Sequence, residues 1–450
     1  MVRNIHSASH RWSLILPNIL SNLAQHCLPG VLRRRGVALA VLSFAIYVCM
    51  VQAPECSARD IPIKHVVIII KENRSFDNYF GTFPGANGAT SGKAGSKRVN
   101  LHHAKLVSQD LPHDWRASLT AINGGKMNGF YRNAPKFAAY VQFHERDIPN
   151  YWQYAKTFAL ADNFFSSMNG PSYPQHLFFA AASSDDIVSD PDDPTHKRSL
   201  AWGCDSDPRA KAQQVDPITG QRTMIVPCFD IPTLPDELNA AGHTWRYYST
   251  PYPDYGFIWS ILDSISHIRY GDQWATNVLD GNTFIKDVGS GQLADVTWIT
   301  PSYLNSDHPP ANVCVGENWS VQIINAIMQS QFWDSTAIFV TWDDFGGFYD
   351  HVPPPKVDYF GMGIRVPLLI LSPYVKAGTV HHTVFEFSSL LKFTEKLFGL
   401  PALTERDAKA DDMMKAFDFN QTPLAPLILS TRQCPKTAQL TVSSSDVDGD

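Results

Sequence analysis

The sequence has 450 residues, of which 44% are hydrophobic and 18% charged, and a net charge of −6 at pH 7. This composition is ordinary for a globular protein, and the chain is long enough to bury a large core. It offers no basic footprint for a polyanion, so we expect no nucleic acid among its partners.

The N-terminal segment has the features of an export signal. Three arginines at 33–35 precede an apolar run from Val37 to about Val51, which is shorter than the roughly 20 residues of a membrane-spanning helix. Ala58 is a plausible cleavage position, and the arginines are similar, imperfectly, to a twin-arginine signal. We expect residues 1–58 to be a signal peptide or, as the alternative, an uncleaved anchor, and the protein to be exported, periplasmic or secreted.

Continuous apolar stretches rich in β-branched residues predict buried strands, at Ile61–Lys71, Val296–Thr300, Thr336–Trp342 and Val366–Leu371. Helical patterns lie between and after them, at Asn318–Ser330 and at Val384–Phe398, where Gly399 is a suitable stop. Strands that alternate with helices predict an α/β fold with a mainly parallel central sheet covered on both faces. We expect one catalytic domain over 59–432 and a disordered tail over 433–450.

Two less regular regions interrupt this pattern. Residues 85–100 are rich in Gly, Ala and Ser and read as a loop, and the Asp- and Pro-rich residues 185–235 read as an excursion. Four cysteines would remain after removal of the leader, an even number that permits two disulfides in an oxidising compartment. Cys204 and Cys228 flank a polar loop and are the favoured local pair, and the alternative is four buried thiols.

Polar side chains with oxygen atoms follow two of the predicted strands. Glu72 and Asn73 come directly after the first strand, and Asp343 and Asp344 directly after Thr336–Trp342. In open α/β sheets, ligands bind beyond the carboxyl ends of the strands. A bound cation would also remove the repulsion between adjacent carboxylates. The pattern therefore predicts one shared metal site, and the alternative is a pair of solvated turns.

Ser172 lies in the segment NGPSYPQHLFF, in which two prolines precede a helical stretch. Pro174 suits a first helical turn, so we expect Ser172 at a helix N-terminus, where backbone N–H groups favour phosphate. Metal coordination could make its hydroxyl a nucleophile. The alternative is a helix-capping serine.

Histidines supply candidate proton donors. His113, in LPHDW, and His308, in NSDHPP, could each donate to a phosphoryl oxygen or protonate a leaving group. Each alone is more often a structural histidine. His176 and His351 lie within the other motifs and could equally orient loops.

Taken together, these segments resemble the bacterial phosphoesterase family that includes non-haemolytic phospholipases C and a group of acid phosphatases. The match is ENRSFDNYFG, GPSYP, SDHPP and WDDFGGFYDHVPPP, in this order over roughly residues 60–400. The resemblance implies an alkaline-phosphatase-like α/β/α core and one divalent metal ion held by the four side chains that follow the strands. It also implies Ser172 as nucleophile, with His113 and His308 at the phosphoryl group.

The chain departs from this family at three positions. Relatives commonly have Asn and Arg where Gln175 and His176 stand, which puts substrate contacts in doubt more than metal binding. Asp344 replaces a frequent Glu and keeps the oxygen ligand on a shorter side chain. Oxygen ligands favour Ca²⁺, Mg²⁺ or Mn²⁺, and Zn²⁺ is a further option because His308 could approach.

We therefore expect an exported, metal-dependent enzyme of phospholipase C or acid phosphatase type, with a phosphate ester or phospholipid substrate and transient contact with a membrane surface. One alternative is a sulfate or phosphonate ester hydrolase of the same fold. It is disfavoured because no Arg follows Ser172 in a C/S-x-P-x-R pattern. The other alternative, a non-catalytic exported binding protein, predicts the loss of a metal ligand, yet all four are present.

Overall fold

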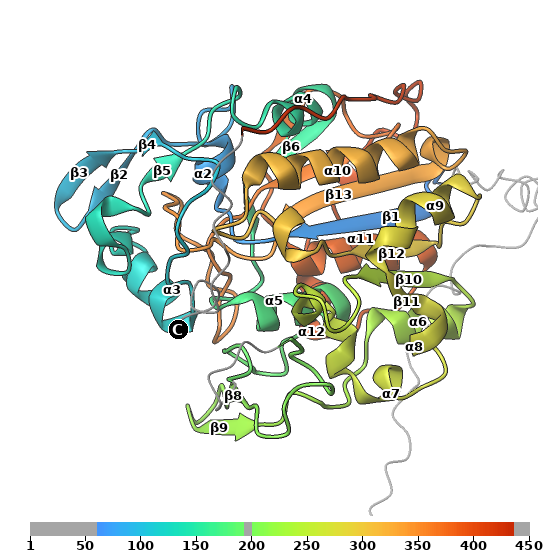
Figure 1. The fold of residues 1–450 in the computed structure, drawn as a ribbon, viewed down its shortest axis with the longest axis horizontal. Helices are drawn as coiled ribbons and strands as arrows, with labels where there is room; N and C mark the ends of the chain where they lie inside the picture. Colours follow the sequence, from blue (N-terminus) through green and yellow to red (C-terminus); the bar gives the residue numbers. More distant parts are fainter. Residues whose placement is uncertain (1–60, 193–199, 436–450) are drawn as a thin grey trace, which may run out of the picture. The chain divides into compact units, whose positions relative to one another are not determined.

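The computed structural model describes residues 61–192 and 200–435, and an eight-stranded sheet forms its centre (Figure 1). The strands lie in the order β11–β10–β12–β1–β13–β14–β6–β15. Their bounds are β1 His65–Lys71, β6 Ala159–Ala161, β10 Trp245–Ser249, β11 Val278–Asp280, β12 Val296–Ile299, β13 Thr336–Trp342, β14 Leu368–Leu371 and β15 Thr379–His381.

The predicted α/β class with a mainly parallel sheet is confirmed. The pairs from β11 through β13 are parallel, and so is β15 with β6, whereas β14 runs antiparallel to both of its neighbours. All seven residues of β13 are buried, as a strand covered on both faces requires. The first strand begins at His65 and not at Ile61, since Pro62 has no N–H for a central ladder.

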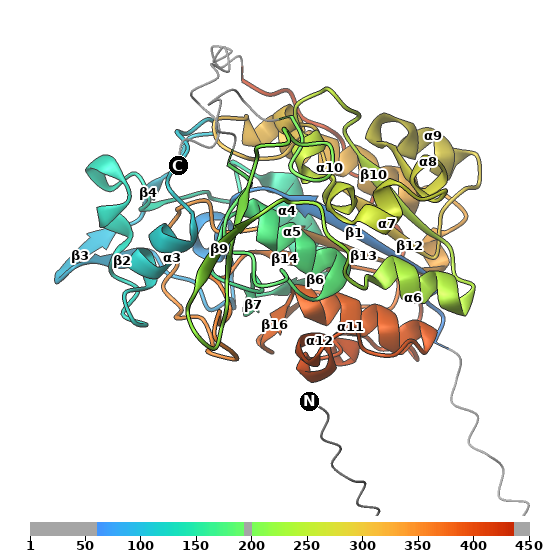
Figure 2. The ribbon, with the colours of Figure 1, turned by 90° about the horizontal axis from the view of Figure 1, so that it is seen from below.

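Helices cover both faces of the sheet (Figures 1 and 2). On one face lie α4 Pro149–Thr157, α9 Phe284–Gly289 and α10 Val313–Met328, and on the other lie α5 Ser172–Ala181, α6 Leu234–Ala241, α11 Phe387–Phe398 and α12 Glu405–Lys409. Helix α11 ends at Gly399, as expected, in the left-handed conformation (φ 69°). Helix α10 starts five residues before the predicted start because the Asn312 side chain caps it.

Shorter elements surround the sheet. They are α2 Phe76–Phe80, α3 Trp115–Ile122, α7 Ser266–Arg269, α8 Trp274–Asn277, β4 His102–His103, β5 Val141–Gln142, β7 Phe164–Phe165 and β16 Phe385–Glu386. The loop expected at 85–100 is partly wrong, because it contains the hairpin of β2 Ser91–Ala94 and β3 Lys97–Asn100, which turns at Gly95 (φ 61°). The excursion at 185–235 contains a second hairpin, β8 Ala212–Val215 and β9 Arg222–Ile225.

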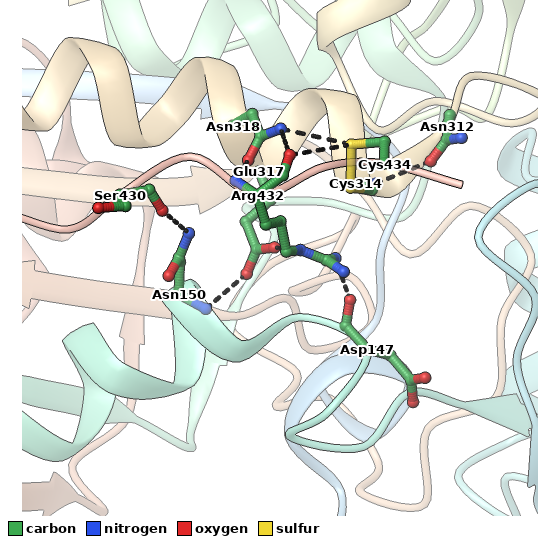
Figure 3. The surroundings of a disulfide bond; sticks show 9 residues. All are labelled: Asp147, Asn150, Asn312, Cys314, Glu317, Asn318, Ser430, Arg432 and Cys434. Atoms are coloured by element: carbon green, nitrogen blue, oxygen red, sulfur yellow. Dashed lines mark hydrogen bonds and ion pairs between the residues drawn. A yellow bond between two sulfur atoms is a disulfide. The ribbon is translucent and has the colours of Figure 1, made fainter. Parts of the chain in front are cut away.

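Two disulfides are present. Cys204 and Cys228 are bonded to each other, which confirms the favoured local pair. Cys314, in α10, is bonded to Cys434, 120 residues further along the chain (Figure 3). Cys434 lies inside the stretch expected to be a disordered tail, and the disulfide attaches it to α10.

The segment before Cys434 is held to α10 by further polar contacts (Figure 3). Arg432 Nε donates to Glu317 Oε2 at 2.7 Å, and Asn318 Nδ2 donates to the carbonyl oxygen of Arg432 at 2.7 Å. Residues 1–60 and 436–450, which include the expected signal peptide or anchor, lie outside the described residues. No helix within the described ranges has the length and apolar character needed to cross a membrane.

Candidate active site

The ends of the neighbouring strands β1 and β13 bring three of the predicted metal ligands, Glu72, Asn73 and Asp343, close together, and Asp344 follows Asp343 in the chain. The two strands are parallel and in register up to the pair Lys71 and Trp342, so the residues that follow each strand leave the sheet at the same edge. Asn73 N donates to Asp343 Oδ1 at 2.8 Å, which joins the two strand ends directly. All four predicted ligands are fully buried.

The Asn73 amide has a defined orientation. His113 Nδ1 lies 2.6 Å from the Leu111 carbonyl oxygen, so Nδ1 carries the proton and Nε2 accepts. Asn73 Nδ2 donates to this Nε2 at 3.3 Å, and Asn73 Oδ1 has no hydrogen-bond partner among the described residues. Asn73 has a left-handed backbone (φ 62°), and a side chain on Gly346 would collide with its carbonyl oxygen at 2.3 Å. Gly346 thus permits the close approach of the two loops.

Ser172 is the first residue of α5, and its side chain points toward the strand ends. Pro171 precedes the helix without a side-chain cap, so Ser172 is not the N-cap residue. Its Oγ lies 3.4 Å from Glu72 Oε2, to which it donates. The expected helix N-terminus is therefore found beside the expected ligand set.

His176 lies one turn further along α5, on the same face of the helix as Ser172. Its Nε2 is 3.1 Å from Glu72 Oε1 and 4.0 Å from Asp343 Oδ2. Glu72, His176 and Asp343 can each offer a ligand atom within 4.8 Å of the others. Burial lowers the pKa of His176 to about 4, which keeps the imidazole neutral at pH 7. The sequence reasoning did not assign His176 to the metal, although its spacing of four residues from Ser172 was a usable signal.

The adjacent carboxylates are left with unused oxygen atoms. Asp344 Oδ1 accepts from Gly346 N at 2.6 Å, whereas Asp344 Oδ2 and Asp343 Oδ2 have no hydrogen-bond partner in the described part of the chain. Burial and the charge of Asp343 raise the pKa of Asp344 well above its usual range. Buried carboxylates are normally paired or bound to metal, so these oxygens and Asn73 Oδ1 fit a hard divalent cation.

The two candidate proton donors lie close to each other. The ring centroids of His113 and His308 are 6.1 Å apart, and His308 Nδ1 lies 2.5 Å from the Pro309 carbonyl oxygen. The rings of Tyr303 and Trp259 pack against His308 at 5.5 and 6.2 Å. In both histidines a backbone carbonyl occupies Nδ1, so proton exchange with a substrate would use Nε2.

Arg365, a buried arginine that the sequence did not single out, holds together the loops that follow β1 and β13. Arg365 donates to both oxygens of Asp350 at 2.9 and 3.1 Å and to Asp77 Oδ1 at 3.3 Å, and all three side chains are fully buried. Asp77 lies five residues after Glu72, and Asp350 six residues after Asp344. His351 contacts Asp77 at 2.7 Å and so orients this loop instead of entering the site.

Comparison with known proteins identifies the family. Residues 63–401, which are most of the chain, match the model described as the Phosphoesterase family. The chain belongs to the phosphoesterase family. It is thus a hydrolase that acts on phosphoric ester bonds, and the expected family resemblance is confirmed.

Among the similar phosphoesterases, phospholipase C B of Mycobacterium tuberculosis is 28% identical and aligns over 82% of this chain and 80% of its own length. Non-specific phospholipase C1 of Arabidopsis thaliana is 27% identical, over 80% of this chain and 72% of the relative. Non-hemolytic phospholipase C of Pseudomonas aeruginosa is 27% identical, over 79% of this chain and 57% of the relative.

Solved structures are more distant. A protein of the alkaline phosphatase superfamily from Vibrio parahaemolyticus is 12% identical, with a TM-score of 0.37 over 81% of this chain and 71% of that chain. Murine ectonucleotide pyrophosphatase/phosphodiesterase 5 is 10% identical, with a TM-score of 0.37 over 76% of this chain and 96% of that chain.

Proposed function

We propose that this phosphoesterase is a metal-dependent enzyme that hydrolyses phosphate esters, phospholipids among them, with Ser172 as the nucleophile. The observation that carries the proposal is the Ser172 hydroxyl, 3.4 Å from Glu72, beside buried oxygens that lack partners within the described residues. The positive end of the helix dipole lies at Ser172, the first residue of α5, and favours a phosphate bound there.

The proposed metal ligands are Glu72, Asn73, Asp343 and Asp344, with His176 as a further nitrogen donor. The oxygens of Asn73, Asp343 and Asp344 that lack a partner among the described residues support this assignment. A bound cation would neutralise the carboxylates and favour the alkoxide form of the serine. The oxygen-rich set favours Ca²⁺, Mg²⁺ or Mn²⁺, and His176 makes the site acceptable to Zn²⁺ as well.

In the first proposed step, Ser172 Oγ attacks phosphorus in line and the bond from phosphorus to the leaving oxygen breaks. The hydroxyl proton passes to Glu72 Oε2, which accepts from Ser172 Oγ at 3.4 Å. His308, protonated at Nε2, gives a proton to the leaving alcohol. While its Nε2 is unprotonated, His113 accepts from the Asn73 amide at 3.3 Å. A proton on Nε2 would break this contact and let His113 donate to a phosphoryl oxygen instead. Water then hydrolyses the phosphoserine ester and releases phosphate or a phosphomonoester.

Two further properties belong to the proposal. Three relatives that carry phospholipase C in their names support a phospholipid substrate, and acid phosphatase activity is the other option within the family. The disulfides Cys204–Cys228 and Cys314–Cys434 support export, because disulfides persist in oxidising compartments.

The test is Ser172→Ala, assayed with phosphatidylcholine, an aryl phosphate and an aryl sulfate while the metal content is measured in parallel. We expect Ser172→Ala to hydrolyse the phosphate esters about 10³-fold or more slowly than the wild-type enzyme and to retain the metal. Ser290→Ala, an exposed serine on the far side of the sheet, is the control. Turnover by Ser172→Ala within tenfold of wild type would refute the serine mechanism, and preferred cleavage of the sulfate would refute the substrate class.

A further inference from the structure

Large apolar side chains are exposed on two neighbouring elements. On the hairpin β8–β9, Ile218 at the turn is 93% exposed, Met224 on the second strand is 50% exposed, and Val226, directly after that strand, is 45% exposed. On α3, Leu119 is 48% exposed, and Trp115, which is half-buried and packs against the main core, lies one turn before it on the same face. We call these five residues the apolar rim.

One end of the hairpin is attached next to Ser172. Tyr173 Oη donates to the carbonyl oxygen of Pro227, the residue that follows Val226, at 3.2 Å. Tyr173 N donates to Asp190 Oδ1 at 2.8 Å, and the segment around Asp190 pairs with β8. The position of the hairpin is therefore fixed by the residue that follows the proposed nucleophile.

The other side of the hairpin reaches the element that carries His113. The Arg222 guanidinium lies over the Trp115 ring, 5.5 Å from its centroid. Trp115 is two residues after His113 and begins α3. The hairpin thus contacts the residue that follows Ser172 at one end and the first residue of the helix that follows His113 on the other side.

The chemistry of the rim favours a phospholipid surface over a protein partner. Its apolar side chains project from a narrow ribbon and a helix face, a shape that suits insertion into a deformable layer. The tryptophan and the arginine stacked on it form the kind of pair found at membrane interfaces, where the ring lies at headgroup level and the guanidinium binds phosphate. The charge of Arg222 complements a phosphate layer that would face it.

We propose that the apolar rim is an interfacial binding surface, which seats the enzyme on a phosphatidylcholine bilayer with the catalytic site facing the lipid. This proposal rests on the proposed phosphoesterase function, because the bilayer is at once the surface and the substrate. The rim would bring the glycerophosphate ester to Ser172 without withdrawing the whole lipid from the layer.

The test measures flotation with phosphatidylcholine vesicles in the Ser172→Ala background, so that the lipid is not consumed. The variant Ile218→Ser/Met224→Ser/Val226→Ser is compared with Ile285→Ser, a 46% exposed isoleucine on α9, a helix that covers the sheet (Figure 1). We expect the rim variant to bind vesicles at least tenfold more weakly and Ile285→Ser to bind within twofold of the parent. Thermal unfolding confirms that each variant is folded.

Three results would overturn the proposal: no vesicle binding by the parent, equal binding by the rim variant, or equal loss in Ile285→Ser. A change of oligomeric mass in the rim variant would assign the rim to a second copy of the chain and would also overturn it. A different assay tests the proposed function itself. If the wild-type enzyme did not hydrolyse an aryl phosphate, which needs no vesicle, the proposed function would fail independently of the rim.

Discussion

The hydroxyl of Ser172 lies 3.4 Å from the carboxylate of Glu72, although 100 residues separate the two in the sequence. Glu72 follows the central strand β1, and Ser172 begins the helix α5 that packs on one face of the sheet. The contact therefore places a helix N-terminus over the carboxyl ends of the strands, where open α/β sheets bind ligands. The following predictions test this arrangement and the contacts that support it.

Asp343→Asn should weaken metal binding at least tenfold, since it removes the charge of a proposed oxygen ligand that also accepts from Asn73 N at 2.8 Å. The exposed Asp334, two residues before β13, supplies the matched control Asp334→Asn, for which we expect unchanged affinity. Isothermal titration calorimetry with Ca²⁺, Mg²⁺, Mn²⁺ and Zn²⁺ measures both variants. Equal affinity of Asp343→Asn and wild type would exclude Asp343 as a ligand.

Arg365→Met should destabilise the protein by about 3–5 kcal/mol, because it leaves the buried carboxylates of Asp77 and Asp350 without their cation. Since these two residues belong to the loops that carry the proposed ligands, the metal affinity of the protein that remains folded should fall as well. Chemical denaturation and metal titration provide the two readouts, with the exposed Arg116→Met as control. A loss of less than about 1 kcal/mol would show that Arg365 does not hold the loops.

Glu395→Gln should reduce the loss of stability that accompanies a rise in pH from about 5 to about 8. Burial, helped by the nearby Asp407, raises the pKa of Glu395 to about 9. The folded protein therefore keeps a proton that the unfolded chain gives up near its usual pKa, so stability falls as pH rises from about 4.5 to about 9. Gln cannot ionise in either state, and we expect roughly 1–3 kcal/mol less decline between pH 5 and pH 8.

Melting temperatures at several pH values measure this difference. The exposed Glu405, whose partner is Lys409, supplies the control Glu405→Gln, which should decline like wild type. If Glu395→Gln and wild type lost stability equally with pH, the raised pKa would not belong to Glu395.

Loss of the Cys314–Cys434 disulfide should cost more stability than loss of Cys204–Cys228. The first bond closes a separation of 120 residues and the second a separation of 24. Because loop-closure entropy grows with the logarithm of loop length, the double serine variant of the long pair should lose about 1 kcal/mol more. Denaturant titrations of the two double variants decide the order, and a larger loss in the short pair would contradict it.

The sequence was sufficient to place the proposed ligands at one edge of the sheet, because β1 and β13 are apolar and end at polar pairs. Parallel neighbouring strands bring such pairs together without knowledge of any other part of the fold. The position of Ser172 beside these ligands could be predicted only from the family motif, since nothing in the local sequence shows that its helix points at the strand ends.

Other features could not be predicted. The contact of His176 with Glu72 depends on how α5 docks, and the hydrogen bonds of the Arg365 side chain go to segments far apart in the sequence. The hairpin of β2 and β3 was missed because its second strand is mostly exposed and shows no apolar alternation. The residues of this hairpin turn at Gly95 without a strong turn motif.

The most direct measurement is a crystal structure of the enzyme soaked with Mn²⁺ and recorded with anomalous scattering. We expect a single ion within about 2.0–2.6 Å of oxygen atoms of Glu72 and Asp343, with Ser172 Oγ next to these ligands. An ion bound elsewhere, or no ion between these residues at a saturating concentration, would contradict it.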